Sequence, residues 1–527
     1  MKDYKKRYRL WSWIRKLLKF MFSRVVIIAF LLLVEMLFML AVVVYFSNYF
    51  YIFVYLSAIL NLLCVCKIIR TDDNPGYKIT WIIVVLMFPP VGVALYFAFS
   101  RNRLSQRTLR KMSSIASISE IMMDDKSDVI NMLREENPDA ARQSAYITNM
   151  AMCPPYKNTE TIYYPTGETF FAALLEAVKS AERYIFLEYF IIAEGSMWKE
   201  LHTLLKAKAA AGVDVRVIYD DFGSITRLNY RVPKILRSEG IKCNVFHPFV
   251  PVLDASQNYR DHRKICVIDG YIAFTGGINI GDEYINITQP HGQWKDNAIQ
   301  IRGEAAWSYV LRFLTMWEYL EHGLNAQKKE TSYDVYKPDP MMRYSGEGIV
   351  QPYTDTPLDN EPVGENIYLQ MLYSAKEYVW ITTPYLIIDE QMKQALCTAA
   401  KSGVDVRIMT PGIPDKKTIY ETTRANYRSL IQNGVKIYEY TPGFLHAKTF
   451  LCDDRYATVG TVNLDFRSLY LHFECGVWMY NTASLGDIKK DYTVMLANCR
   501  KIEEKDCKVG FLRETYRSVL RIIAPML

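Results

Sequence analysis

Three long apolar stretches occupy the N-terminal fifth of this chain, at residues 25–46, 49–69 and 79–99. Each is close to the roughly 20 residues that an α-helix needs to cross a bilayer. The first stretch is too long for the core of a signal peptide and lacks a small-x-small cleavage site, so it predicts a retained membrane span. Together with the second stretch it predicts a transmembrane hairpin.

The third apolar stretch is interrupted at its middle by Pro89-Pro90. Basic clusters flank the membrane region at 1–24, 67–78 and 101–111, and positively charged segments tend to stay on the cytoplasmic side. If all three clusters are cytoplasmic, the third stretch must enter and leave by the same face, with the prolines at its turn. We therefore expect two spans and a re-entrant or interfacial segment. The alternative is three true spans with the remainder of the chain outside.

A long internal repeat follows the membrane region. The phrase SAERY at 180–184 recurs as SAKEY at 374–378, and GVDVR at 212–216 recurs at 403–407. In both copies amphipathic helical patterns alternate with strand-like apolar runs, which predicts a layered α/β fold. The predicted domains are a membrane region at 1–111, a linker at 112–150, and two α/β domains at 151–330 and 340–527.

Each copy carries one polar motif with the same internal spacing. Side chains at i and i+2 of a strand point to one face, so the His and Lys of each motif project together. Turn residues then predict a hairpin that brings His, Lys and Asn to one place. A single match can arise by chance, but two matched copies indicate function. The first set is His262, Lys264, Asp269, Gly276, Gly277 and Asn279, and the second is His446, Lys448, Asp453, Gly460, Thr461 and Asn463.

The two motifs together offer the groups that phosphodiester exchange requires. Two lysines and two asparagines can bind the nonbridging oxygens of a phosphate. One neutral imidazole can attack phosphorus while a protonated one donates to the leaving alkoxide, and the second imidazole later deprotonates the incoming hydroxyl. The symmetry of the repeat does not decide which His is the nucleophile. No metal-ligand spacing and no glycine-rich phosphate loop occurs, so we expect no metal and no other cofactor.

These motifs resemble the phospholipase D superfamily. The phrases NYRDHRKICVIDG, TGGINIGDEY and VGTVNLDFRSLYLHFE, and the upstream NPGYKITWIIVVLMFPPVG, are similar to its bacterial cardiolipin synthase branch over nearly all of 50–527. The resemblance implies two tandem phospholipase D-like domains that share one active site. It also implies phosphatidyl transfer between two phosphatidylglycerol molecules through a phosphatidyl-histidine, giving cardiolipin and glycerol. A membrane-bound hydrolase, or a transferase with another phospholipid donor, is the alternative.

The resemblance further implies roles for individual residues. It favours His262 as nucleophile and His446 as acid. It assigns Asp296 and Glu474 as carboxylates that orient the histidines, while Asp269 and Asp453 hold the motif hairpins together. Asp296 departs from the Glu of the second copy, and surface ion pairs are the alternative for both orienting acids.

Charge is distributed unevenly along the chain. Residues 1–111 carry 17 Lys and Arg against four acids, a net +13, so the total of +7 leaves −6 for 112–527. An acidic catalytic portion disfavours a nucleic-acid partner, and a basic membrane region suits an anionic bilayer. Ten cysteines without metal-ligand spacing suit a reduced cytosolic setting. We expect a multi-pass protein of the bacterial cell membrane with cytoplasmic catalytic domains, acting on phosphatidylglycerol, and leave its oligomeric state open.

Two further segments have apolar patterns that suggest a membrane surface. The stretch FHPFVPVL at 246–253 predicts a lip that dips into the bilayer beside the first motif. The C-terminal stretch 511–523 has an apolar stripe and is either a packing helix or a membrane-surface helix.

Overall fold

The computed structural model describes residues 50–100, 126–248, 255–322, 333–338, 344–359 and 361–526, together with positions 33, 37 and 41. The chain divides into two compact units. The membrane unit comprises 1–104, 249–258 and 522–527, and the catalytic unit comprises 105–248 and 259–521. The predicted span at 25–46 lies outside the described residues apart from those three positions, as do residues 249–253 of the predicted lip.

Three apolar helices form most of the described part of the membrane unit, α3 (Phe50–Ile69), α4 (Pro75–Met87) and α5 (Val91–Phe99). Within α3, Tyr51–Ile69 is long and apolar enough to cross a membrane, with a mean hydropathy of 2.3, which suggests a membrane anchor. The predicted third stretch forms two shorter helices, and neither α4 nor α5 reaches the roughly 20 residues of a span. A turn between two short helices is what a re-entrant segment requires, while the number of spans stays a prediction.

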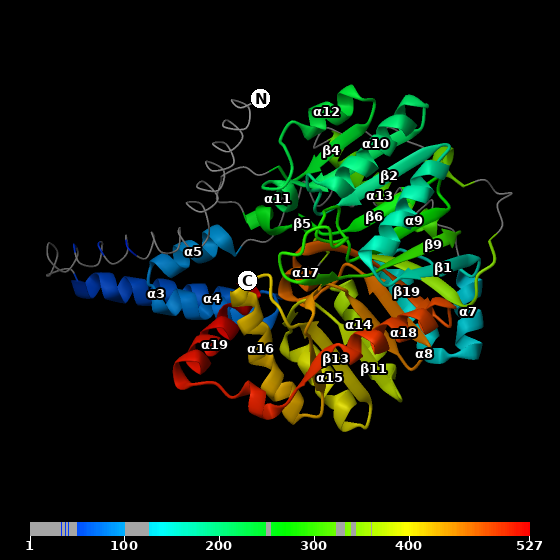
Figure 1. Cartoon of the computed structure of the whole chain (residues 1–527). Coiled ribbons are helices and arrows are strands. Elements are labelled where there is room, and N and C mark those ends of the chain that lie inside the picture. Colours follow the sequence, from blue (N-terminus) through cyan, green and yellow to red (C-terminus); the bar gives the residue numbers. More distant parts are fainter. Residues whose placement is uncertain are drawn as a thin grey trace. The chain divides into compact units, whose positions relative to one another are not determined.

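Two mixed β-sheets form the frame of the catalytic unit (Figure 1). The first lobe has the strand order β1-β9-β7-β6-β2-β3-β4, and the second has β10-β19-β17-β16-β11-β13-β14-β20, so seven strands follow the same order in both. In each lobe three neighbouring strands are parallel and the others antiparallel. The first-lobe strands are β1 (Thr159–Tyr164), β2 (Tyr184–Tyr189), β3 (Asp214–Asp220), β4 (Lys242–Phe246), β6 (Lys264–Ile268), β7 (Ile272–Gly276) and β9 (Ala298–Gly303). The second-lobe strands are β10 (Ile349–Asp355), β11 (Tyr378–Thr382), β13 (Asp405–Pro411), β14 (Lys436–Tyr440), β16 (Thr449–Cys452), β17 (Tyr456–Gly460), β19 (His472–Tyr480) and β20 (Cys499–Ile502).

Amphipathic helices pack against both sheets. In α9, for example, Thr166 caps the N-terminus and Phe170, Leu174 and Val178 are buried at helical spacing. This confirms the predicted fold of two repeated α/β domains. The first-lobe helices are α9 (Gly167–Ser180), α10 (Ser196–Ala210), α11 (Asp221–Ser224), α12 (Val232–Ser238) and α13 (Ala306–His322). The second-lobe helices are α14 (Val363–Ser374), α15 (Glu390–Lys401), α16 (Lys417–Gln432), α17 (Phe466–Tyr470), α18 (Ser484–Ala497) and α19 (Phe511–Ile523).

The predicted linker at 112–150 contains two helices in its described part, α7 (Ser127–Glu136) and α8 (Pro138–Ala151). Several of their apolar residues, among them Leu133 and Ile147, are fully buried in the hydrophobic core of the second lobe. The composition of the segment is that of a polar linker, but each helix has one narrow apolar stripe, and these stripes pack against the second lobe.

The two lobes meet along strands β7, β9, β17 and β19. Two short parallel pairs cross between them, β5 (Arg260–Asp261) with β19, and β8 (Gln293–Lys295) with β15 (Gly443–Leu445). Each pair lies immediately before a motif histidine. The junction of the lobes is therefore also where the two motifs come together.

Candidate active site

The aspartates of the two motifs anchor each hairpin from within its own lobe. Asp269 has a φ of +51° and its carboxylate accepts hydrogen bonds of 2.8 Å from the backbone N–H groups of 182–184. Asp453, with a φ of +52°, accepts bonds of 2.7–2.9 Å from 376–378 in the same way. The recurring phrases SAERY and SAKEY are thus the partners of these aspartates, which lie at the strand end opposite to the histidines.

His262 is positioned by a strand pair that crosses between the lobes. Its backbone N–H donates to the carbonyl of Phe473 at 3.0 Å, which extends the pairing of β5 with β19 by one residue. This register places the imidazole beside Glu474. The Nδ1 atom of His262 lies 2.9 and 3.0 Å from the two carboxylate oxygens.

His446 is positioned by the equivalent pair on the other side. Its N–H donates to the carbonyl of Lys295 at 2.7 Å, following the pairing of β15 with β8. Its Nδ1 atom lies 2.6 Å from Oδ2 of Asp296. Each lobe therefore supplies the carboxylate for the other lobe's imidazole, which leaves Nε2 of both rings for chemistry.

The small pair in each motif adapts the site to the length of its carboxylate. A Cβ on Gly277 would lie 2.0 Å from Oδ1 of Asp296, so only glycine leaves room there. At the same place in the second copy, Thr461 donates its hydroxyl to Glu474, which also accepts from Ser468 at 2.7 Å. The exchange of Asp for Glu between the repeats is thus matched by an exchange of Gly for Thr.

The two motif lysines are buried beside the histidines. Nζ of Lys264 donates to the carbonyl of His262 at 2.5 Å, and Nζ of Lys448 donates to the carbonyl of His446 and lies 2.9 Å from its Nδ1. Burial lowers the pKa of Lys264 to about 8 and that of Lys448 to about 7. Burying two lysine ammonium groups without a counter-charge is energetically costly. The site is therefore well suited to bind an anion between them.

The pKa values of the two histidines respond to different neighbours. Burial, followed by Lys264 and Lys448, holds the pKa of His262 well below its ordinary value. Burial and Lys448 lower the pKa of His446 to about 4, but Asp296 acts in the opposite direction. The carboxylate itself stays ionised, because His446 and Lys448 outweigh burial and hold the pKa of Asp296 below its ordinary range.

The two motif asparagines are used differently. Asn279 accepts a hydrogen bond from the N–H of Ile191 at 3.0 Å and donates to the hydroxyl of Tyr284 at 2.7 Å. Asn463 is 4% exposed, and its Oδ1 has no hydrogen-bond partner among the residues that the structure describes. Asn463 therefore has hydrogen-bonding capacity to spare within the site.

Aromatic rings that the motif analysis did not single out line the two imidazoles. Phe190 and His472 lie 4.9 and 5.4 Å from His262 between ring centroids. Trp294 and Tyr284 lie 5.4 and 5.7 Å from His446. Trp294 and His472 each stand two residues before an orienting carboxylate, so strand alternation could have identified them.

One group in the site has a donor set that a metal ion can use. The ligand atoms of His262, His472 and Glu474 all lie within 4.8 Å of one another. Glu474 and His262 already bond each other, and burial lowers the pKa of His472 to about 3. The observed contacts are therefore those of an oriented imidazole, and the expectation of a metal-free site stays a prediction.

Comparison with known proteins identifies the family. The model of the "Cardiolipin synthase, PLD-like domain" family matches residues 174–310 and 368–496, which include all ten predicted site residues, and an N-terminal phospholipase D-nuclease family matches 59–101. The chain belongs to the cardiolipin synthase-like family of the phospholipase D superfamily. The cardiolipin synthase-like repeats of the family model thus coincide with the two lobes seen here.

Individual relatives agree with this family assignment over most of the chain. A cardiolipin synthase of Geobacillus sp. (strain WCH70) is 34% identical over 460 residues, which cover 86% of this chain and 90% of the relative. Cardiolipin synthase 2 of Bacillus anthracis is 32% identical over 88% of this chain and 89% of the relative. An uncharacterized protein of Streptococcus mutans is 41% identical over 85% and 96%.

A solved structure supports the fold. The crystal structure of phosphatidylserine synthase from Haemophilus influenzae has a TM-score of 0.56 and 14% identity, and the match covers 73% of this chain and 97% of that chain. At this identity the likeness concerns the fold, and it confirms the two phospholipase D-like α/β domains.

Proposed function

We propose that this chain is a cardiolipin synthase, which transfers a phosphatidyl group between two phosphatidylglycerol molecules and releases glycerol. The observation that carries the proposal is the crossed arrangement in which Glu474 holds His262 and Asp296 holds His446. Two oriented imidazoles at one lysine-lined junction can serve one phosphate. The names of the relatives supply the substrate class, phospholipids, and the product.

In the first half-reaction, Nε2 of neutral His262 attacks the phosphorus of the donor lipid. The bond to the glycerol headgroup oxygen breaks, and His446 donates a proton to that oxygen, so that glycerol leaves. The assignment of roles follows the resemblance to the superfamily. Burial lowers the pKa of both histidines, and the difference between them is that Asp296 partly opposes this effect at His446. Lys264 and Lys448 neutralise the nonbridging oxygens.

In the second half-reaction, a hydroxyl of another phosphatidylglycerol headgroup attacks the phosphatidyl-histidine. His446, now neutral, takes the proton of that hydroxyl, and the bond between phosphorus and His262 breaks. One phosphodiester replaces another, so the exchange needs no nucleotide. We assign Asn463 to the substrate, because its amide oxygen has no partner among the described residues and can accept from the incoming hydroxyl, while its amide N–H group can donate to the phosphate.

We place the protein in the bacterial cell membrane with its catalytic lobes on the cytoplasmic side. The apolar helix α3, the turn between α4 and α5, and the basic clusters that flank the apolar stretches support this topology. A reporter fused to the C-terminus should behave as cytoplasmic. If the reporter is external, the third apolar stretch crosses the membrane fully and is not a re-entrant segment.

The activity is tested with purified protein and phosphatidylglycerol labelled in its headgroup and acyl chains. We expect cardiolipin and glycerol in equal amounts, and no product from His446→Ala. Lys179→Ala is the matched control, because Lys179 contacts only the exposed Glu176 on α9 among the described residues. Phosphatidic acid as the sole lipid product would instead identify a hydrolase. Cardiolipin that forms only when another phospholipid is added would identify that phospholipid as the donor.

A further inference from the structure

Helix α19 exposes most of its apolar residues and buries one arginine. The exposed fractions of Phe511 and Leu512 are both 83%, and that of Val519 is 50%, whereas Arg517 is 4% exposed. At 3.6 residues per turn, Phe511, Leu512, Tyr516, Val519 and Ile522 fall on one side of the helix. A helix on a water-soluble body has the opposite orientation.

Ion pairs hold α19 in this orientation. Nε of Arg517 donates to Glu421 of α16 at 2.9 Å, and Nε of Arg513 donates to the same carboxylate at 3.1 Å. These contacts, the one from Arg513 first, lower the pKa of Glu421 despite its partial burial. The charged side of α19 is thus bound to the second lobe, which directs the apolar side outward.

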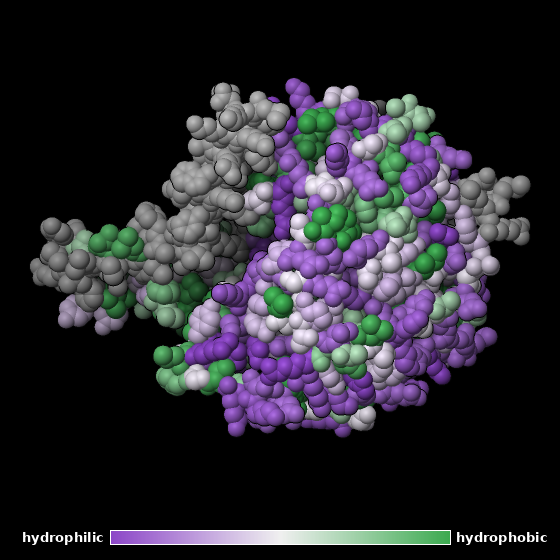
Figure 2. All heavy atoms as spheres, viewed as in Figure 1, coloured by the Kyte–Doolittle hydropathy of each residue, from purple (hydrophilic) through white to green (hydrophobic). Residues whose placement is uncertain are grey.

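The surface view shows the consequence. In Figure 2 a hydrophobic cluster occupies the place where Figure 1 draws α19, next to the largely hydrophilic surface of the second lobe. An exposed apolar patch rimmed by polar residues marks an interaction site.

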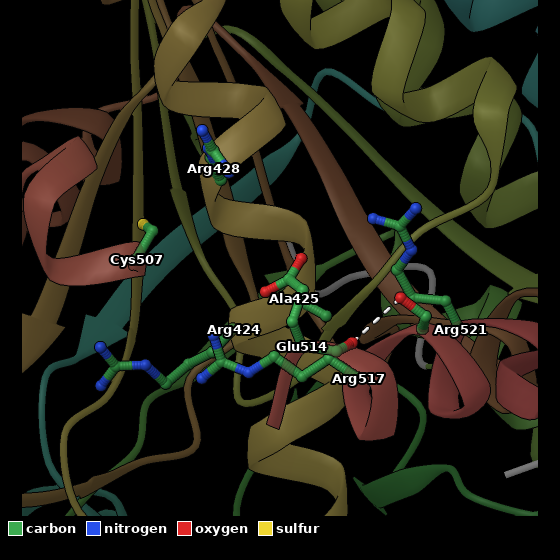
Figure 3. A pocket seen from close by; sticks show the side chains of 8 residues that line it. Arg424, Ala425, Arg428, Cys507, Glu514, Arg517 and Arg521 are labelled. Atoms are coloured by element: carbon green, nitrogen blue, oxygen red, sulfur yellow. Dashed lines mark hydrogen bonds between the residues drawn. The ribbon is translucent and has the colours of Figure 1, made fainter. Parts of the chain in front are cut away.

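Arginines surround a pocket at the junction of α16 and α19 (Figure 3). Arg424 is engaged by Glu439 at 3.2 Å, and Arg428 lies 3.6 Å from Glu504. Arg521 is exposed and has no ion pair within the described part of the chain. The remaining lining residues are Ala425, Cys507, Glu514, Arg517 and Ser518.

We propose that α19 lies in the surface of a bilayer containing anionic phospholipid, with its apolar side among the acyl chains and with Arg428 and Arg521 at the level of the lipid phosphates. Two features favour lipid over a protein partner. Arg428 and Arg521 line the pocket on the lobe-facing side of α19, so apolar residues lie on one side of the helix and cations on the other, as in a helix at a membrane surface. The residues after Arg521 also belong to the membrane unit, where Thr80 of α4 donates to the carbonyl of Ile522 at 2.6 Å.

The proposal is tested by placing a probe on α19 in the full-length protein. Leu512→Cys is labelled with an environment-sensitive fluorophore in a Cys66→Ser background, since Cys66 is the exposed cysteine among the ten. In nanodiscs with phosphatidylglycerol we expect a blue-shifted emission and at least about twofold quenching by lipids carrying spin labels on their acyl chains. Lys179→Cys on α9 is the matched exposed control and should show neither change.

The arginines are tested with the same probe. Raising the phosphatidylglycerol content of the nanodisc should increase quenching at position 512, and the double variant Arg428→Gln, Arg521→Gln should remove this dependence. Absence of quenching at Leu512→Cys overturns the proposal, and so does a probe that is shielded only when two copies are cross-linked through α19. The fluorescence measurement needs no catalytic turnover, and it depends on the proposed function only in assuming that the protein lies in a membrane. It can therefore fail independently of the test for cardiolipin synthesis.

Discussion

The two half-sites of the catalytic unit share a backbone frame but differ in the chemistry of their side chains. Both place a histidine one residue after a crossing strand pair and beside the other lobe's carboxylate. His262 is paired with a glutamate that two hydroxyls also bind, whereas His446 is paired with an aspartate and lies next to Lys448. Duplication provides two equivalent positions, and the surrounding side chains make the positions unequal, as a nucleophile and an acid must be.

The largest expected effect separates the two histidines. Either His262→Ala or His446→Ala should lower kcat/KM for phosphatidylglycerol by about 10⁴-fold. A donor with a p-nitrophenol headgroup distinguishes them, because p-nitrophenolate leaves without a proton. His446→Ala should still release p-nitrophenolate in a single turnover, and His262→Ala should release none. The reverse result would exchange the two roles.

The carboxylates provide the second test of the crossed arrangement. Glu474→Gln and Asp296→Asn should each lower kcat by about 10³-fold, because an amide cannot hold the required imidazole tautomer or stabilise the imidazolium. With the p-nitrophenol donor, Asp296→Asn should resemble His446→Ala, and Glu474→Gln should resemble His262→Ala. If each variant instead matched the histidine of its own lobe, the crossed pairing would not operate during turnover.

Asp269→Asn serves as a control for the loss of a motif carboxylate away from the imidazoles. In this variant the side-chain N–H group would lie opposite the backbone N–H of residue 182, so two donors would meet and one hydrogen bond would be lost. The free energy of unfolding should fall by about 1–3 kcal/mol, while kcat should stay close to that of the parent. Denaturation and turnover, measured on the same preparation, separate this structural loss from a catalytic one.

The repeat made much of this architecture predictable from the sequence. Matched spacing identified both hairpins, and strand alternation placed His and Lys on one face. The partner of each carboxylate was not predictable, because it depends on the register of β5 against β19 and of β8 against β15, and each of these pairs joins residues more than 140 positions apart. The docking of α7 and α8 was missed for a similar reason, since their apolar stripes are narrow and their partners are distant in the sequence.

The asparagines should also give unequal results. Asn463→Ala should lower kcat/KM by about 10²-fold with little change in stability, because its amide oxygen has no partner among the described residues. Asn279→Ala removes the acceptor of Ile191 N–H and the partner of the Tyr284 hydroxyl, so it should cost about 1–3 kcal/mol of unfolding free energy. Equal losses of kcat/KM at equal stability would show that both amides contact substrate.

The smallest expected effect is the pH dependence that the two lysines confer. Lys448 and Lys264 have pKa values of about 7 and about 8, so each loses its positive charge as the pH rises through that value. The free enzyme then binds an anionic phosphate less well, so kcat/KM should fall by about tenfold per pH unit above about pH 7 and more steeply above about pH 8. Bound phosphate favours the charged lysines, so kcat should fall less than kcat/KM.

Arginine substitutions sharpen this test, because a guanidinium stays charged across the accessible pH range. Lys448→Arg should shift the alkaline limb of the kcat/KM profile upward, toward the pKa of Lys264, which then controls it alone. Lys264→Arg should leave the limb near the lower pKa of Lys448, about 7. The two substitutions would therefore displace the same limb by different amounts, and identical profiles for the parent and both variants would show that neither lysine titrates during phosphate binding.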